Sequence, residues 1–200
     1  MEKIINGICE ELVKTQIVSK QDVPIYQYGL KMLLLKVVYI ASFIIYALLV
    51  GALKETILFL ITYSLLRSYS GGYHASSILK CYIVSLSTVI SNSVLCKVSI
   101  TGNLFKADIV LLILSSIFIF LFSPVDNHEK QLDNLEKKVY GYRAKICVVC
   151  CFTLFIVFNM LNITQTMAIA VNNAVVLESV MMILGTVKSY AQICLQTPAE

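Results

Sequence analysis

This chain contains apolar runs that are long enough, as helices, to cross a lipid bilayer. They limit the folds that it can adopt. Residues 32–53 form one such run, in which Lys36 is the only charged side chain. A helix of about 20 apolar residues crosses the hydrocarbon core of a membrane. Inside that core every backbone N–H and C=O group must bond within the protein, which leaves helices or closed barrels. The pattern predicts an all-α, polytopic membrane helix bundle.

Further apolar segments predict about six spans in a single membrane-embedded domain, residues 1–200. The spans are expected near residues 32–53, 56–69, 78–98, 109–122, 146–163 and 167–187. The second is short, roughly 21 Å as a helix against a core of about 30 Å. Residues 1–22 are expected to hold an amphipathic helix at the membrane surface. Residues 126–145 are expected to form a charged loop, and residues after 187 a short tail.

Composition excludes several classes of protein. Only 14% of residues are charged, against about 25% in soluble domains, so no separate soluble domain is expected. The net charge of +4 comes from scattered basic residues, which argues against a nucleic-acid partner. The N-terminus lacks the pattern of a signal peptide. Seven cysteines, most of them inside apolar runs, do not form the framework of a disulfide-rich protein.

The distribution of Lys and Arg predicts the orientation in the membrane. With the N-terminus inside, the inner segments hold twelve Lys and Arg, and the outer loops hold three, namely Lys54, Lys97 and Lys106. Cytoplasmic loops carry the excess of basic residues in membrane proteins. The N-terminus and the polar segment 67–81 are therefore expected to face the cytoplasm.

That polar segment is where chemistry is expected, because it holds His74, one of two histidines, and Cys81. A cysteine nucleophile needs a nearby base or surroundings that favour the thiolate. A free thiol has a pKa near 8.5, so ionising it at pH 7 costs about 2 kcal/mol, and burial adds to that cost. We predict a catalytic pair in which Cys81 is the nucleophile and His74 is the base.

The spacing of this pair requires a bend in the chain. Residues seven apart on an unbroken helix stand about 10 Å apart along its axis, too far for contact. Gly71 and Gly72 allow an irregular turn, and Ser76 or Ser77 can cap a new helix. Cys81 is then expected near the first turn of that helix, where the amide dipoles favour a thiolate.

A polar stripe runs along the predicted third span from the same segment. Its residues recur at spacings of three and four and are Ser77, Cys81, Ser85, Thr88 and Asn92. A stripe of this kind is expected to line a cavity or a helix contact rather than lipid. The alternative is that these small residues only permit close helix packing.

Two charged residues are candidates for support of the substrate or the transition state. Arg67 is expected to bind a substrate carboxylate or developing negative charge, or else to set topology as an interfacial charge. Glu178 lies mid-way through the predicted sixth span, after Asn172 and Asn173. A carboxylate inside a membrane is a functional candidate. No carboxylate that orients His74 is identified, and Asn92 or a backbone carbonyl is the candidate for that role.

The remaining cysteines and the second histidine indicate no metal or cofactor. Cys147, Cys150 and Cys151 suggest a metal motif, but they lie mid-span without a histidine or carboxylate and are interpreted as small apolar residues. Cys9, Cys96 and Cys194 receive the same interpretation. His128, in the expected charged loop, is interpreted as an interfacial residue.

The run from Arg67 through Gly71-Gly72-Tyr73-His74-Ala75 to Cys81 resembles the signature of the accessory gene regulator protein B (AgrB) family. The likeness extends to chain length, span number, orientation and the turn at Pro124. The resemblance implies a membrane cysteine endopeptidase of bacterial quorum sensing, located in the cell membrane, with members that form homodimers. Its implied partner is a small precursor peptide (AgrD-like) with an amphipathic leader and an acidic tail.

The resemblance also implies a mechanism for this chain. Cys81 attacks the scissile carbonyl while His74 transfers the proton, the C-terminal tail leaves, and a thiol or hydroxyl of the peptide closes a thiolactone or lactone ring. The basic segment 130–145 is expected to contact lipid or the acidic tail. The alternative function is a small membrane transporter or scaffold subunit with a polar pathway around Glu178 and Lys36.

Overall fold

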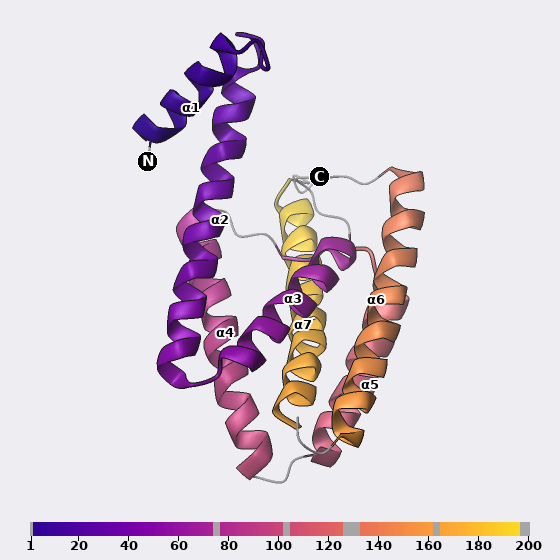
Figure 1. The fold of residues 1–200 in the computed structure, drawn as a ribbon. Coiled ribbons are helices and arrows are strands. Elements are labelled where there is room, and N and C mark those ends of the chain that lie inside the picture. Colours follow the sequence, from indigo (N-terminus) through magenta and orange to yellow (C-terminus); the bar gives the residue numbers. More distant parts are fainter. Residues whose placement is uncertain (1, 74–76, 102–104, 126–132, 162–164, 197–200) are drawn as a thin grey trace. The chain divides into compact units, whose positions relative to one another are not determined.

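The computed structural model describes residues 2–73, 77–101, 105–125, 133–161 and 165–196, and its named elements are all helices (Figure 1). They are α1 (Glu2–Lys14), α2 (Val23–Val50), α3 (Leu53–Ser70), α4 (Ile78–Thr101), α5 (Phe105–Phe122), α6 (Asn134–Met160) and α7 (Gln165–Gln196). The prediction of an all-α fold is confirmed.

The chain divides into two compact parts, residues 1–46 and 47–200, and each is described by itself. In the first part α1 is the amphipathic helix that the sequence predicts. Ile5 and Cys9 are buried on one of its faces, while Glu11 and Lys14 form an exposed ion pair on another. The side-chain amide of Gln27 donates a hydrogen bond to Asn6 (3.1 Å), which joins α2 to α1. The location of α1 at a membrane surface stays a prediction.

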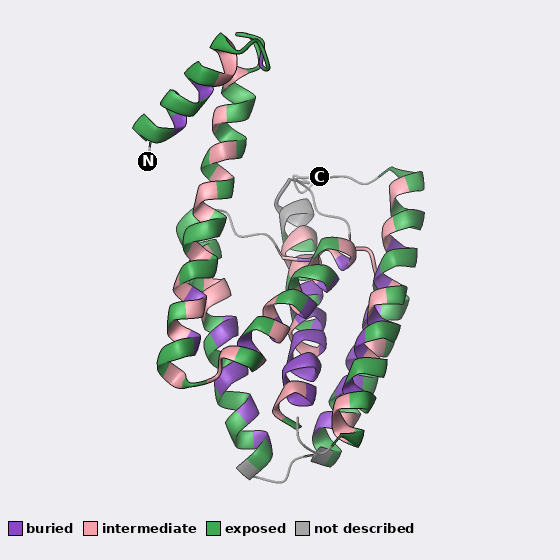
Figure 2. Cartoon of the chain, viewed as in Figure 1, coloured by how far each residue is buried: buried purple, intermediate pink, exposed green. Residues whose placement is uncertain are grey.

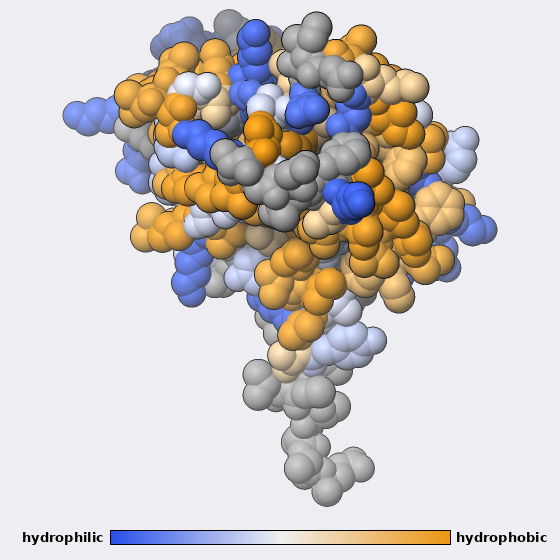
Figure 3. Space-filling view, turned by 90° about the horizontal axis from the view of Figure 1, so that it is seen from below, coloured by the Kyte–Doolittle hydropathy of each residue, from blue (hydrophilic) through white to orange (hydrophobic). Residues whose placement is uncertain are grey.

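Four of the described helices are long and apolar enough to cross a membrane, namely α2, α4, α6 and α7. Large apolar side chains are exposed along them, and they cover much of the surface seen in Figure 3. In water such a surface would drive aggregation, whereas lipid accommodates it. The chain is therefore a multi-pass membrane protein, and the number of six spans stays a prediction.

The largest differences from the predicted helix boundaries are at α2, α6 and α7. α2 begins at Val23, well before residue 32, and α7 continues to Gln196, so the expected tail is largely helical. α6 begins at Asn134, so the prediction of a loop over 126–145 was wrong for its described part. Asp133 caps α6 in a reciprocal capping box with Glu136, and Lys, Glu and Arg are good helix formers. Hydropathy marks only the apolar part of such a helix.

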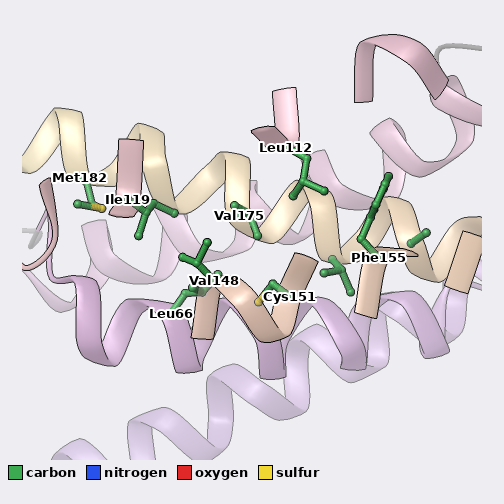
Figure 4. Packing of buried hydrophobic residues seen from close by; sticks show 10 residues of the cluster. Leu66, Leu112, Ile119, Val148, Cys151, Phe155, Val175 and Met182 are labelled. Atoms are coloured by element: carbon green, nitrogen blue, oxygen red, sulfur yellow. The ribbon is translucent and has the colours of Figure 1, made fainter. Parts of the chain in front are cut away.

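The centre of the part 47–200 is α7, which packs against α3, α4, α5 and α6. Of its most apolar stretch, 67% is buried, against 33% or less for the other three candidate spans, as the buried colour along α7 shows in Figure 2. The apolar core joins four helices, with Leu66 from α3, Leu112 and Ile119 from α5, Val148, Cys151 and Phe155 from α6, and Val175 and Met182 from α7 (Figure 4).

We call one end of this bundle the site end. It holds the turn after α3, which belongs to the polar segment 67–81. The end of α3 pairs with the chain after α5 through a parallel bridge between Gly71 and Val125. Tyr69 contacts the start of α6, where Arg143 lies 5.6 Å from its ring centre. Lys188, near the end of α7, lies 5.2 Å from the ring centre of Tyr73. Residues far apart in sequence therefore surround the turn after α3.

Candidate active site

The turn that follows α3 has the irregular backbone that the glycine pair predicts. Gly71 has φ 77° and Gly72 has φ 118°, both in the region that disfavours residues with a side chain. The backbone N–H of Val125 donates to the carbonyl of Ser70 (2.9 Å), and that of Tyr73 donates to Met181 (3.0 Å). The turn is thus held by the chain after α5 and by α7.

Close approach of α7 also explains Gly185, which the sequence did not single out. A Cβ atom there would stand 2.5 Å from the carbonyl carbon of Gly72 and 2.6 Å from the nitrogen of Tyr73. Real Cβ atoms do not come so close to backbone. Only glycine at this position lets the turn lie directly on α7.

The Arg67 side chain wraps around this turn from α3. Its guanidinium donates to the carbonyl of Gly71 (2.9 Å) and to that of Tyr73. Its Nη1 also lies 3.8 Å from Oε1 of Glu178, an ion pair with one fully buried partner. Ser70 Oγ donates to the same Oε1 (2.8 Å). Both charged residues were candidates from the sequence, which indicated neither their pairing nor the part of Ser70.

The predicted helix cap is present at the start of α4. The backbone N–H of Lys80 donates to Oγ of Ser77 (3.3 Å), and that of Cys81 donates to the carbonyl of Ser77 (3.0 Å). Cys81 therefore lies in the first turns of α4, and its side chain is exposed. His74, Ser76 and His128 lie outside the described residues.

The polar stripe of α4 passes from the surface into the bundle. Ser77 and Cys81 are exposed, Ser85 is half-buried, and Thr88 and Asn92 are buried. Asn92 Oδ1 accepts a hydrogen bond from the Asn173 amide of α7 (3.0 Å). The deep half of the stripe is thus a polar helix contact, which is one of the two environments expected for it. Cys81 occupies the half that remains accessible.

No cluster of three or more His, Cys, Asp and Glu suited to a metal ion occurs among the residues that the structure describes. Cys151 is part of the apolar core and Cys147 packs against it. An apolar hollow lies between the start of α5 and the end of α6, lined by Ile109, Leu112, Phe152, Phe155, Ile156, Asn159 and Met160. It lies away from the site end and contains none of the candidate residues.

The site end thus presents an exposed thiol at a capped helix start, after a turn whose backbone is held from two sides. A family model for accessory gene regulator B matches residues 1–199. The chain belongs to the AgrB family.

Curated relatives agree with this assignment. AgrB-like protein 2 of Clostridium perfringens strain 13 is 27% identical over 168 residues, which cover 82% of this chain and 77% of that protein. The AgrB-like protein of strain SM101 is 29% identical over 70% of this chain and 66% of its own length. AgrB-like protein 1 of strain 13 is 32% identical over 62% and 66%. No solved structure matches the chain. Membership of the AgrB family supports a role in the agr quorum-sensing system.

Proposed function

We propose that this chain is a membrane-embedded cysteine endopeptidase that processes and cyclises a small precursor peptide for quorum sensing. The observation that carries the proposal is the position of Cys81. Its exposed thiol lies in the first turns of α4, and the braced turn 71–73 leads directly into His74. Among the described cysteines, Cys9, Cys96 and Cys151 are buried, and a buried thiol is a poor nucleophile.

The first step breaks the peptide bond. His74 takes the proton of the Cys81 thiol, the sulfur attacks the scissile carbonyl, and a tetrahedral oxyanion forms. His74 then gives its proton to the leaving amine, and the C-terminal tail departs. The remaining peptide is joined to Cys81 as a thioester.

The second step closes the ring. A thiol or hydroxyl within the bound peptide loses its proton to His74 and attacks the thioester carbonyl. The Cys81–acyl bond breaks, Cys81 recovers a proton from His74, and a thiolactone or lactone is released. For a thiolactone this step exchanges one thioester for another and needs little driving force. Conversion of an amide into a thioester is uphill, so removal of the products must pull the reaction.

The precursor, an AgrD-like peptide, meets the enzyme at the cytoplasmic face of the bacterial cell membrane. Within the part 47–200 the described basic residues support this orientation, because Arg67, Lys80, Arg143 and Lys188 are at the site end and Lys54, Lys97 and Lys106 are at the other. These cations suit an acidic tail. We also propose that two copies of the chain form a homodimer in the lipid bilayer.

The test compares purified variants incubated with the candidate precursor, with the products weighed by mass spectrometry. C81A and H74A are expected to abolish cleavage while the protein still inserts. C150A is the matched control, since Cys150 is also exposed but lies in α6, and it is expected to cleave normally. If C81A cleaved the precursor at the wild-type rate, the proposed cysteine endopeptidase function would be ruled out.

The transporter or scaffold hypothesis gives Glu178 a different role, in a polar pathway. Its contacts with Arg67 and Ser70 are with the turn that precedes His74, which supports the peptidase. Under the transporter hypothesis Cys81 is dispensable, so the C81A measurement also separates the two functions.

A further inference from the structure

The most deeply buried charge in the described part of the chain lies next to the turn that precedes His74. Glu178 is 0% exposed, and 108 residues separate it from Ser70, which donates to its Oε1 (2.8 Å). Among the residues that the structure describes, none forms a hydrogen bond with its Oε2. A buried carboxylate is costly even when it is paired, and apolar residues often stabilise the same position better. Stability alone therefore does not account for a glutamate here.

The contacts of Glu178 continue into the backbone of the turn. Arg67 Nη1, which lies 3.8 Å from Glu178 Oε1, donates to the carbonyl of Gly71 (2.9 Å). The other terminal nitrogen of Arg67 donates to the carbonyl of Tyr73. A guanidinium is planar, so holding two of its nitrogens on two carbonyls sets the relative position of those carbonyls. The negative charge of Glu178 attracts the guanidinium and keeps it in the bundle.

One face of α7 carries three residues that act on the turn. Glu178, Met181 and Gly185 follow at spacings of three and four, which places them on one side of the helix. Glu178 acts through Arg67, Met181 accepts the Tyr73 N–H (3.0 Å), and Gly185 leaves room for the backbone. The residue that follows Tyr73 in the chain is His74.

We propose that Glu178 is a positioning residue, which acts through Arg67 and Ser70 to hold the backbone of residues 71–73, the segment that leads into the proposed base His74. This inference rests on the proposed cysteine peptidase. Glu178 is fully buried, so its role is assigned through its contacts with Arg67 and Ser70. Its charge attracts the guanidinium, and the guanidinium holds the carbonyls of Gly71 and Tyr73.

The test measures peptide cleavage by E178Q, which keeps the size of the side chain and an oxygen for Ser70 but loses the charge. We expect kcat to fall about 100-fold, because a displacement of about 1 Å has that effect on a catalytic group. KM is expected to change less than about threefold, since Glu178 itself is fully buried and is assigned no part in substrate binding. The matched control is D108N, which removes another buried carboxylate held by a serine, Ser99 (3.3 Å), and is expected to keep the wild-type kcat.

A double-mutant cycle distinguishes positioning from general damage. If Glu178 acts through Arg67, R67A/E178Q is expected to cleave no more slowly than R67A alone. The proposal is overturned if E178Q lowers kcat by the same factor in R67A as in the wild type. It is also overturned if kcat of E178Q equals that of the wild type. If E178Q does not accumulate in the membrane, S70A replaces it, with an expected loss of about tenfold in kcat.

A second readout needs no precursor. The rate at which iodoacetamide alkylates Cys81, followed by mass spectrometry of its peptide, is expected to fall about tenfold in E178Q, because a displaced imidazole no longer assists the thiol. The control is the rate at which Cys81 is alkylated in D108N, which is expected to match the wild type. If C81A still cleaves the precursor, the proposed function fails. If Cys81 is required but E178Q matches the wild type in both assays, only the positioning role fails.

Discussion

Two buried carboxylates, each bonded to a serine, lie at opposite ends of the bundle and differ in the part of the backbone that they hold. At the site end, Glu178 of α7 accepts a hydrogen bond from Ser70 and faces Arg67. At the other end, Asp108 of α5 accepts one from Ser99 of α4 (3.3 Å). Both carboxylates are buried, and both join two helices through a serine.

The difference lies in what each carboxylate holds. The contact of Asp108 joins the first turn of α5 to the last turn of α4, so both of its residues lie in helix. The contacts of Glu178 reach a turn with two glycines at positive φ, whose carbonyls take bonds from Arg67. A buried charge adds little to a helix that is already formed. It has most effect where the backbone has no regular structure of its own.

The largest expected effect comes from closing the space between α7 and the turn. In G185A the new Cβ meets the backbone of Gly72 at 2.5 Å, so the turn must move. We expect the cleavage rate to fall at least about 100-fold and the free energy of unfolding to fall by about 1–3 kcal/mol. In G29A, a helical position with nothing within 4 Å, activity is expected to persist. Full activity in G185A would show that the turn does not need this contact.

The two serines offer a direct test of the comparison. S70A removes the hydrogen bond to Glu178 at the site end, and S99A removes the one to Asp108 at the other end. A hydrogen bond to a charged group contributes about 1.5 kcal/mol, so S70A is expected to lower the cleavage rate about tenfold. S99A is expected to leave the rate unchanged while thermal unfolding shifts. Equal loss of activity in both variants would mean that the two ends do not differ.

Removing the deep polar contact of the stripe is expected to affect stability more than catalysis. N173A takes away the amide that donates to Asn92 (3.0 Å) between two buried side chains. The unfolding free energy is expected to fall by about 1–2 kcal/mol. N159A is the control, because the hydrogen bond that its amide makes among the described residues goes to the carbonyl of Phe155 in its own helix. A cleavage rate that falls more in N173A than in S70A would place the deep stripe in the site.

The smallest effect is expected at the start of α6. D133A removes one side of the capping box with Glu136, which costs about 1 kcal/mol of helix stability. The first turn of α6 is expected to exchange its amide hydrogens faster, with cleavage little changed. Unchanged exchange would indicate that other contacts hold this helix end.

Much of the fold was predictable because lipid imposes a simple rule on sequence. Most of the run at 32–53 lies within α2, the glycine pair ends α3, and Ser77 caps α4. Hydropathy failed at α6, where charged residues with high helix propensity extend the helix beyond its apolar part. The same limitation explains the early start of α2 at Val23 and the late end of α7 at Gln196.

The candidate site was predictable only in its local part. Cys81, Ser77 and the turn at Gly71 and Gly72 lie within one short segment, so spacing and turn chemistry identify them. The role of His74 stays a prediction, because it lies outside the described residues. Ser70 and Gly185 gave no signal in the sequence, since a serine near a helix end and a glycine in an apolar helix are common.

The sequence by itself determined the helical class, the breaks between helices and the polar segment that holds a thiol and an imidazole. These follow from local rules, namely the length of apolar runs, glycine at positive φ and a serine cap. Only the tertiary structure decided that α7 lies at the centre and that Glu178 faces Arg67. That pairing depends on which faces of two distant helices meet, and packing over the whole bundle selects those faces.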